Sequence, residues 1–273
     1  AMNPRLQALF NQGKPVIGMV HVQALPGTPG NIYSVSEIVK MAVQESKDLA
    51  SNGVDSVMLE NMHDIPYLKR HVGPEIVASM TRVATEVRQQ LDIPLGLQIL
   101  AGANQSALAV AQSAEFDFIR AEGFVFGHLA DEGLFESDAG TLLRYRKQIG
   151  ADDIAIFTDI KKKHSSHAIS ADVSLADTAE AAHFFKSDGL IITGTATGKP
   201  VDVNDLKAVK MNSTLPILVG SGATPDSIAD LLEFADSIIV GSWLKKKGLW
   251  TEAVDGERVR TFMQAIKAFT QGH

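Results

Sequence analysis

The amino-acid sequence predicts a single closed (β/α)8 barrel, the TIM-barrel class of α/β folds. Eight short runs rich in Val, Ile and Leu recur along the 273 residues, with amphipathic helical patterns between them. Strands that are apolar throughout are typical of a parallel sheet covered on both faces. Two glycine turns, Gly220-Ser221-Gly222 and Gly241-Ser242, follow the last two runs. In such barrels the phosphate site lies after strands seven and eight.

The predicted strands share a continuous apolar character and a short length. They span residues 16–20, 54–59, 95–100, 116–120, 154–158, 190–193, 217–219 and 237–240. A doubly wound open sheet is the rival fold, and it places a G-x-G-x-x-G loop after its first strand. The segment from His21 to Gly27 lacks that pattern, so the barrel is favoured.

The intervening helices carry recognisable start and stop signals. Ser34 and Glu37 form a capping box for a helix over 35–51, and Gly53 follows its end. Thr224 and Pro225 are typical of the N-cap and first turn of the seventh helix. The other expected helices span 74–91, 104–114, 139–149, 173–186, 203–211 and 256–270. We expect longer loops after strands one, four and five.

We expect residues 1–273 to form one domain, with 1–14 as an N-terminal extension. The net charge of −7 and pI of about 5.6 disfavour nucleic-acid or anionic-membrane binding, which needs a basic surface. The chain has no cysteine, which excludes disulfides, thiolate metal sites and a cysteine nucleophile. No apolar run is long enough to cross a membrane, and we expect a cytoplasmic protein without membrane insertion.

Glycines after buried strands let backbone N–H groups approach an anion closely. A further glycine-threonine loop follows the sixth strand, and it resembles a P-loop. It has three residues between its glycines and Pro200 after its lysine, so it is not one. The predicted phosphate-binding residues are Gly194, Thr195, Gly220, Ser221, Gly222, Gly241 and Ser242. The alternative is that these glycines only form tight turns.

Ionisable residues at strand ends are the candidates for catalysis, because a carboxylate in an apolar strand is unfavourable unless it is paired or functional. Asp159 and Lys161 share strand parity and are expected to project the same way. A lysine there could act as an acid or base or form a Schiff base, and a structural ion pair is the alternative. The predicted catalytic residues are Glu60, Asp159, Lys161, Glu122 and His21.

Other polar residues at the same end of the barrel are expected to bind substrate. They are Asn61, Gln98, Arg120, Thr193, Lys163 and His164. The lysine-rich segment 161–167 also spaces His164 and His167 as H-x-x-H, which could contribute to a metal site. A metal held by His21, Glu60 and Asp159 is geometrically conceivable. No cofactor is assigned, and a divalent metal is left open.

Motifs along almost the whole chain resemble the BtpA family. They include PVIGMVH at 15–21, LPGTP at 25–29, VGPE at 72–75, LRYR at 143–146, TGTATG at 193–198, VGSG at 219–222 and DGERV at 255–259. The resemblance implies a barrel of the ribulose-phosphate-binding type. The family is named for a role in photosystem I accumulation, and other members resemble proteins of sugar operons.

The sequence therefore predicts an enzyme that acts on a small phosphorylated sugar or a related metabolite. An isomerase or epimerase, a lyase and a hydrolase all stay open as reaction classes. The alternative is a non-catalytic binding or assembly factor of the BtpA type. Whether the chain also forms a homo-oligomer is left open.

Overall fold

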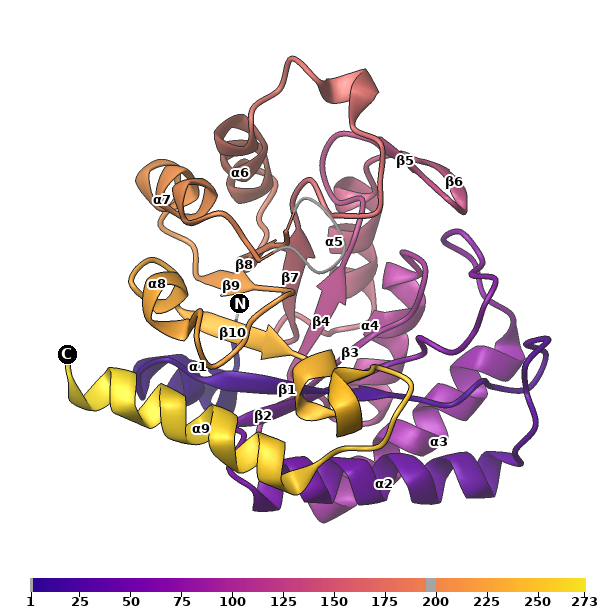
Figure 1. Ribbon diagram of the computed structural model, residues 1–273. Coiled ribbons are helices and arrows are strands. Elements are labelled where there is room, and N and C mark those ends of the chain that lie inside the picture. Colours follow the sequence, from indigo (N-terminus) through magenta and orange to yellow (C-terminus); the bar gives the residue numbers. More distant parts are fainter. Residues whose placement is uncertain (1, 195–199) are drawn as a thin grey trace.

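The computed structural model describes residues 2–194 and 200–273, and they form a TIM barrel (Figure 1). Its strands are all parallel and close in the order β1-β10-β9-β8-β7-β4-β3-β2. They are β1 (Val16–His21), β2 (Ser56–Glu60), β3 (Leu95–Gln98), β4 (Phe118–Ala121), β7 (Ala155–Asp159), β8 (Gly189–Ile192), β9 (Ile217–Val219) and β10 (Ser237–Val240). Each of these strands coincides with a predicted apolar run, so the predicted fold is confirmed.

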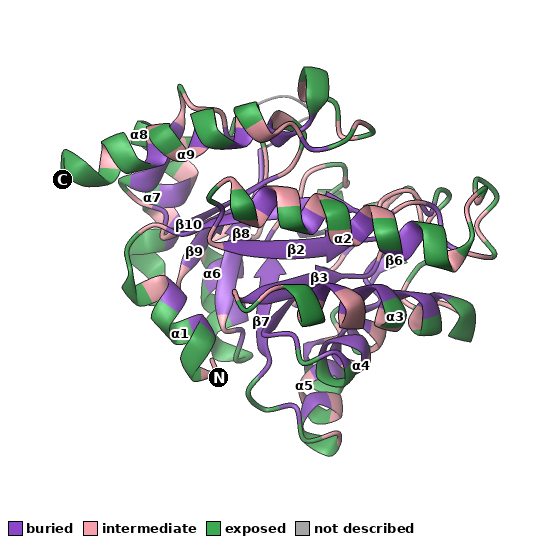
Figure 2. Ribbon diagram, turned by 90° about the horizontal axis from the view of Figure 1, so that it is seen from below, coloured by how far each residue is buried: buried purple, intermediate pink, exposed green. Residues whose placement is uncertain are grey.

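The barrel is surrounded by helices whose outer faces are exposed, whereas the barrel strands are buried except at Arg120 (Figure 2). They are α2 (Val35–Ser51), α3 (Pro74–Gln90), α4 (Asn104–Ser113), α5 (Ala139–Gln148), α6 (Leu175–Phe184), α7 (Val203–Asn212), α8 (Ile228–Leu232) and α9 (Gly256–Gln271). The predicted capping box of α2 is present, because the Ser34 side chain accepts from the Glu37 backbone and Glu37 accepts in return.

The helix after β9 begins later than predicted. Thr224 and Pro225 lie in a turn, and α8 starts at Ile228 with Ser227 as its N-cap residue. The Ser227 hydroxyl accepts a hydrogen bond from the Thr224 N–H at 3.0 Å and thereby fixes the turn ahead of the helix. The prediction of Thr224 as the N-cap is therefore wrong.

The loops after β1, β4 and β7 are long, as expected, and two of them contain structure that was not predicted. The loop after β4 holds an antiparallel hairpin, β5 (His128–Ala130) with β6 (Gly133–Phe135). The loop after β7 contains a short 3-10 turn, Ala168–Ser170. The loops after β2, residues 61–73, and after β10, residues 241–255, are also long, which was not predicted. The second of these contains two 3-10 turns, Ser242–Leu244 and Lys246–Gly248.

The other end of the barrel is closed by a helix that was not predicted, α1 (Pro4–Asn11). Asn3 caps it by accepting a hydrogen bond from the Leu6 N–H at 2.9 Å. Leu6 and Leu9 pack against the side chains inside the barrel, including Ile17, Phe118 and Phe157. Residues 2–11 thus complete the interior core. A second and larger core lies between the strands and the outer helices.

Within the described part of the chain, the helices are all too short or too polar to cross a membrane.

We expect Leu6→Ala to lower the free energy of unfolding by about 2–5 kcal/mol, because it removes a fully buried side chain from the closed end of the barrel. Urea unfolding measures the change. Gln7→Ala, at an exposed position of the same helix, is the matched control and should change stability by less than about 0.5 kcal/mol. Equal effects of the two substitutions would show that α1 does not contribute to the core.

Candidate functional site

The site is formed by the layer of side chains inside the barrel that lies nearest the carboxyl ends of the strands. An apolar interior layer contains Met19, Met58, Phe118, Phe157, Ile191, Leu218 and Ile239. Side chains two positions further along a strand point to the same side. The next layer therefore takes one residue from each strand. It consists of His21, Glu60, Gln98, Arg120, Asp159, Thr193, Gly220 and Gly241.

These residues form the floor of a cavity of about 570 Å³ at the carboxyl ends of the strands. The loops after the strands form its walls, including Tyr67, Glu122, Lys162 and Trp243. All eight floor residues are among the site residues predicted from the sequence, because each stands at the end of an apolar run. The volume is within the range of small-molecule sites.

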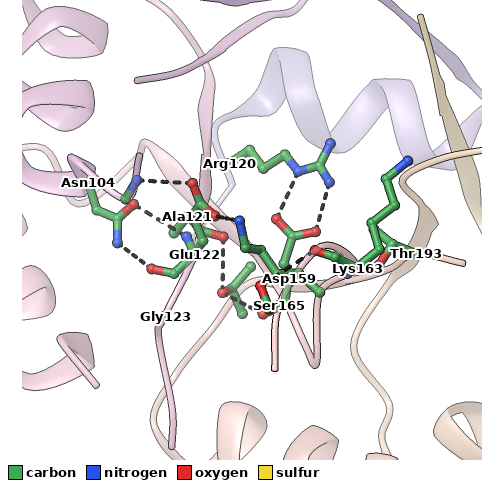
Figure 3. A network of polar contacts seen from close by, with 12 residues as sticks. Asn104, Arg120, Ala121, Glu122, Gly123, Asp159, Lys163, Ser165 and Thr193 are labelled. Atoms are coloured by element: carbon green, nitrogen blue, oxygen red, sulfur yellow. Dashed lines mark hydrogen bonds and ion pairs between the residues drawn. The ribbon is translucent and has the colours of Figure 1, made fainter. Parts of the chain in front are cut away.

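Arg120 and Asp159 form a bidentate ion pair across the neighbouring strands β4 and β7 (Figure 3). Arg120 donates from Nε to Oδ2 at 2.9 Å and from Nη2 to Oδ1 at 2.7 Å. Burial alone would lower the pKa of Arg120, but the Asp159 carboxylate raises it. The two parallel hydrogen bonds hold the aspartate in one orientation.

Glu122 is fully buried and is ionised by its partners. Lys162 lies 2.6 Å from Oε2, and the Gly102 N–H donates to Oε1 at 3.0 Å. Burial would raise the pKa of Glu122, but the Lys162 ammonium and the Gly102 N–H hold it below its usual value. Figure 3 shows Asn104 bonded to the backbone of the same segment. Glu122 thus anchors the loops after β3 and β7.

Glu60 differs from these two carboxyl groups. Its side chain is buried at the floor of the cavity and makes no hydrogen bond or ion pair within residues 2–194 and 200–273. Burial, together with the negative charges of Glu122 and Asp159, raises the pKa of Glu60 to about 7, although Arg120 opposes this shift. Such a carboxyl can both give and take a proton near neutral pH.

His21 lies beside Glu60 in the register of β1 and β2. Its Nδ1 donates to the Trp250 carbonyl oxygen at 3.2 Å. Burial and the positive charge of Lys245 lower the pKa of His21 to about 3, so the ring is neutral. With the proton on Nδ1, Nε2 is a hydrogen-bond acceptor on the side of Gly241. The two side chains give the floor an acid–base group next to a neutral acceptor.

The glycine turns supply backbone donors at the ends of β9 and β10, next to β1. The N–H groups of Gly222, Ala223, Ser242 and Trp243 line the cavity and make no hydrogen bond with any described residue. Gly222 has a φ of +73°, which favours glycine. Four free donors from two adjacent loops can surround an anion. We refer to these four residues as the anion cradle.

Two of the predicted phosphate-binding glycines have their N–H groups occupied. The Gly220 N–H donates to the Ile192 carbonyl at 2.8 Å, and the Gly194 N–H donates to the Ser221 hydroxyl at 3.1 Å. Neither N–H is available to an anion in this structure, so any phosphate contact there would have to use other atoms. Thr195 lies outside the described residues.

Lys161 and Asn61 do not line the cavity. Lys161 has a φ of +45°, and its ammonium donates to the Ser170 carbonyl at 3.0 Å. The expectation that Lys161 projects with Asp159 is wrong. Strand β7 ends at Asp159, so the alternation of side chains along the strand does not continue to Lys161. Asn61 instead bonds Asp64 at 3.0 Å and the Leu100 N–H at 2.7 Å, so it connects two loops.

The remaining predicted substrate-binding residues line the cavity. They are Gln98, Arg120, Thr193, Lys163 and His164. Lys162 was missed, although it stands in the lysine run that the sequence reading singled out. Among the described residues no group of three potential ligands is arranged to hold a metal ion. Asp159, one of the three conceivable ligands, has both oxygens bound by Arg120.

Comparisons with known proteins agree with this architecture. The sequence profile of the BtpA family matches residues 12–268. An uncharacterized mitochondrial protein of Caenorhabditis elegans is 44% identical over 264 residues, covering 94% of this chain and 95% of its own. The photosystem I biogenesis protein BtpA of Synechocystis is 35% identical over 260 residues, covering 94% and 89%.

Solved structures share the fold at low sequence identity. The (S)-3-O-geranylgeranylglyceryl phosphate synthase of Thermoplasma acidophilum, solved with sn-glycerol-1-phosphate, aligns with a TM-score of 0.62 and 16% identity, covering 98% of this chain and 100% of its own. The phosphoribosyl anthranilate isomerase of Thermus thermophilus aligns with a TM-score of 0.58 and 10% identity, covering 93% and 98%. At these identities the likeness shows the barrel alone.

We expect Glu60→Gln to stabilise the protein more at about pH 8 than at about pH 5. The raised pKa of Glu60 means that the folded state resists ionisation between its unfolded value and about 7, so wild-type stability falls over this range. The glutamine variant has no such loss, and it should gain about 1–3 kcal/mol between the two pH values. Urea unfolding at both measures the difference.

Glu180→Gln, at an exposed position on α6, controls for the loss of a carboxyl group. A gain for Glu60→Gln that is the same at both pH values would contradict the protonated state assigned to Glu60.

Proposed function

The chain belongs to the BtpA family, and we propose that it is an enzyme that binds a small phosphorylated sugar or related metabolite in the mouth of its barrel and transfers a proton with Glu60. The observation that carries the proposal is the placement of Glu60. A carboxyl group with a pKa of about 7, and with no partner among the described residues, lies in one cavity with an anion cradle.

The cradle supports a phosphorylated ligand. Free N–H groups of Gly222, Ala223, Ser242 and Trp243 are donors fixed by the backbone, so they need little rearrangement on binding. They lie after β9 and β10, where barrels of this class bind phosphate. The Thermoplasma synthase, a structural neighbour, was solved with a glycerol phosphate. The position of the cradle and the bound phosphate of this neighbour both support phosphate binding by this chain.

Proton transfer follows from the charges around Glu60. Lys162 holds the pKa of Glu122 below its usual value, and both oxygens of Asp159 accept hydrogen bonds from Arg120. Glu60 is the remaining carboxyl group of the floor, and near neutral pH it exists in both protonation states. Isomerisation, epimerisation and carbon–carbon bond cleavage all include a proton transfer of this kind, so the proposal covers these classes.

A non-catalytic assembly function is the second candidate, because one relative is named a photosystem I biogenesis protein. The β5–β6 hairpin at the rim exposes Leu129 and Leu134, which a partner could cover. This function predicts a stable protein complex and no ligand in the cavity.

We expect phosphorylated sugars to raise the thermal midpoint of unfolding, and Gly222→Asp to abolish the effect. A ligand at 100 times its Kd stabilises the folded state by about 2.7 kcal/mol. An aspartate would place a negative charge in the cradle. Glycerol 1-phosphate, dihydroxyacetone phosphate and ribose 5-phosphate are suitable probes for a thermal-shift assay.

Gly150→Asp is the matched control, because Gly150 has a φ of +70°, close to the +73° of Gly222, and lies at the opposite end of the barrel. Absence of any shift in the wild type, or equal loss in the two variants, would refute phosphate binding at the cradle.

For whichever probe binds and is converted, we expect Glu60→Gln to lower kcat by about 10²–10⁴-fold while leaving the thermal shift in place. The glutamine keeps the shape of the side chain but cannot exchange a proton. Turnover assayed by NMR of the sugar phosphate measures the loss. Wild-type turnover in the variant would exclude Glu60 as the acid–base group.

A further inference from the structure

Three lysines in the loops after β7 and β10 have their ammonium groups bound. Lys161 donates to the Ser170 carbonyl, and Lys162 pairs with Glu122. Lys245 is fully buried and donates to the Met19 carbonyl at 2.7 Å. The ammonium of Lys163 makes no hydrogen bond or ion pair within the part of the chain that the structure describes.

The backbone fixes Lys163 at the wall of the cavity. Its N–H donates to the Thr193 hydroxyl at 2.9 Å, which joins the loop after β7 to the end of β8. The side chain lines the cavity that also contains Glu60 and the anion cradle. Figure 3 shows it extending beside the Arg120–Asp159 pair, with no contact drawn to its ammonium. A ligand in the cavity would therefore meet this amine.

The surroundings of Lys163 disfavour its charged form. Burial lowers the pKa of Lys163, and the positive charge of Arg120 lowers it further, although Asp159 and Glu60 oppose the shift. Each unit by which a lysine pKa falls gives about tenfold more neutral amine at a given pH. Neutral amines are nucleophiles, and lysines next to another cation serve as Schiff-base residues in other enzymes.

We propose that Lys163 is a catalytic nucleophile that forms an imine with the carbonyl carbon of a phosphorylated aldehyde or ketone. This inference rests on the proposed function and narrows its substrate class to carbonyl compounds. It rests on an unpartnered amine that shares one cavity with a protonated carboxyl group and a set of anion donors.

The step balances with groups already present. The nitrogen lone pair of Lys163 attacks the carbonyl carbon, and the oxygen becomes a hydroxyl as a proton moves from nitrogen to oxygen. Protonated Glu60 then gives its proton to that hydroxyl, which leaves as water, and the nitrogen lone pair forms the C=N bond. The resulting iminium withdraws electrons, so ionised Glu60 can remove a proton from the neighbouring carbon. Water later hydrolyses the imine and restores the amine.

The alternative is that Lys163 acts only as a fixed positive charge for the ligand. The two roles separate in Lys163→Arg, which keeps the charge but cannot form an imine. A charge-only role predicts that this variant behaves like the wild type.

The test is reductive trapping with dihydroxyacetone phosphate and sodium borohydride, read by intact mass spectrometry and peptide mapping. Borohydride supplies the hydride that converts an imine into a stable secondary amine. We expect one adduct per chain at Lys163, at a yield about tenfold or more above that of any exposed lysine. Unphosphorylated dihydroxyacetone should label it far less, because it cannot use the cradle.

Lys163→Arg should remove the adduct while keeping the thermal shift with dihydroxyacetone phosphate. Lys246→Met, which removes an exposed lysine near the rim, should leave labelling of Lys163 unchanged. A thermal shift without an adduct at Lys163, or equal labelling of exposed lysines, would overturn the inference and leave the proposed function intact. Absence of both the shift and the adduct would overturn the two together.

Discussion

The ion pair between Arg120 and Asp159 is the interaction on which the rest of the site depends. It stands inside the barrel, directly above the apolar layer formed by Phe118 and Phe157. A charge at that depth is stable only if it is paired and fully hydrogen-bonded. A Cβ at Gly220 would lie 2.5 Å from a methyl group of Ile191 and 3.0 Å from Arg120 Nη2. Glycine at the start of the turn after β9 therefore leaves room for Ile191 and for the arginine.

The same pair determines the state of Glu60. Arg120 binds both oxygens of Asp159, and Lys162 binds Glu122. Neither of these two cations is bound to Glu60. Its carboxyl therefore keeps its proton up to about neutral pH. One buried carboxyl is made available for chemistry by satisfying the two beside it, a pattern typical of acid–base sites. The family relationship and the shared barrel identify the scaffold, whereas these local charges support a function.

The sequence predicts the barrel well because its strands are buried on both faces and its helices carry local caps. It predicts poorly what depends on contacts between distant segments. The start of helix α1 is marked in the sequence by Asn3 and Pro4. Its few apolar residues do not predict a helix by themselves, because they are buried only by contact with the barrel interior. The strands of the β5–β6 hairpin are too short to show an apolar run. Strand alternation continued past Asp159 predicts that Lys161 faces the cavity. The backbone instead adopts a positive φ at Lys161, and Lys162 lines the cavity.

The most direct test of the account is a ¹³C NMR titration of the Glu60 carboxyl, assigned by comparison with Glu60→Gln, in the absence and presence of inorganic phosphate. We expect a pKa of about 7 in the free protein, rising further when phosphate occupies the cradle, because an added negative charge in the cavity disfavours the carboxylate. A pKa near the ordinary glutamate value, or one that phosphate does not change, would contradict the claim that an acid–base group and an anion site share this cavity.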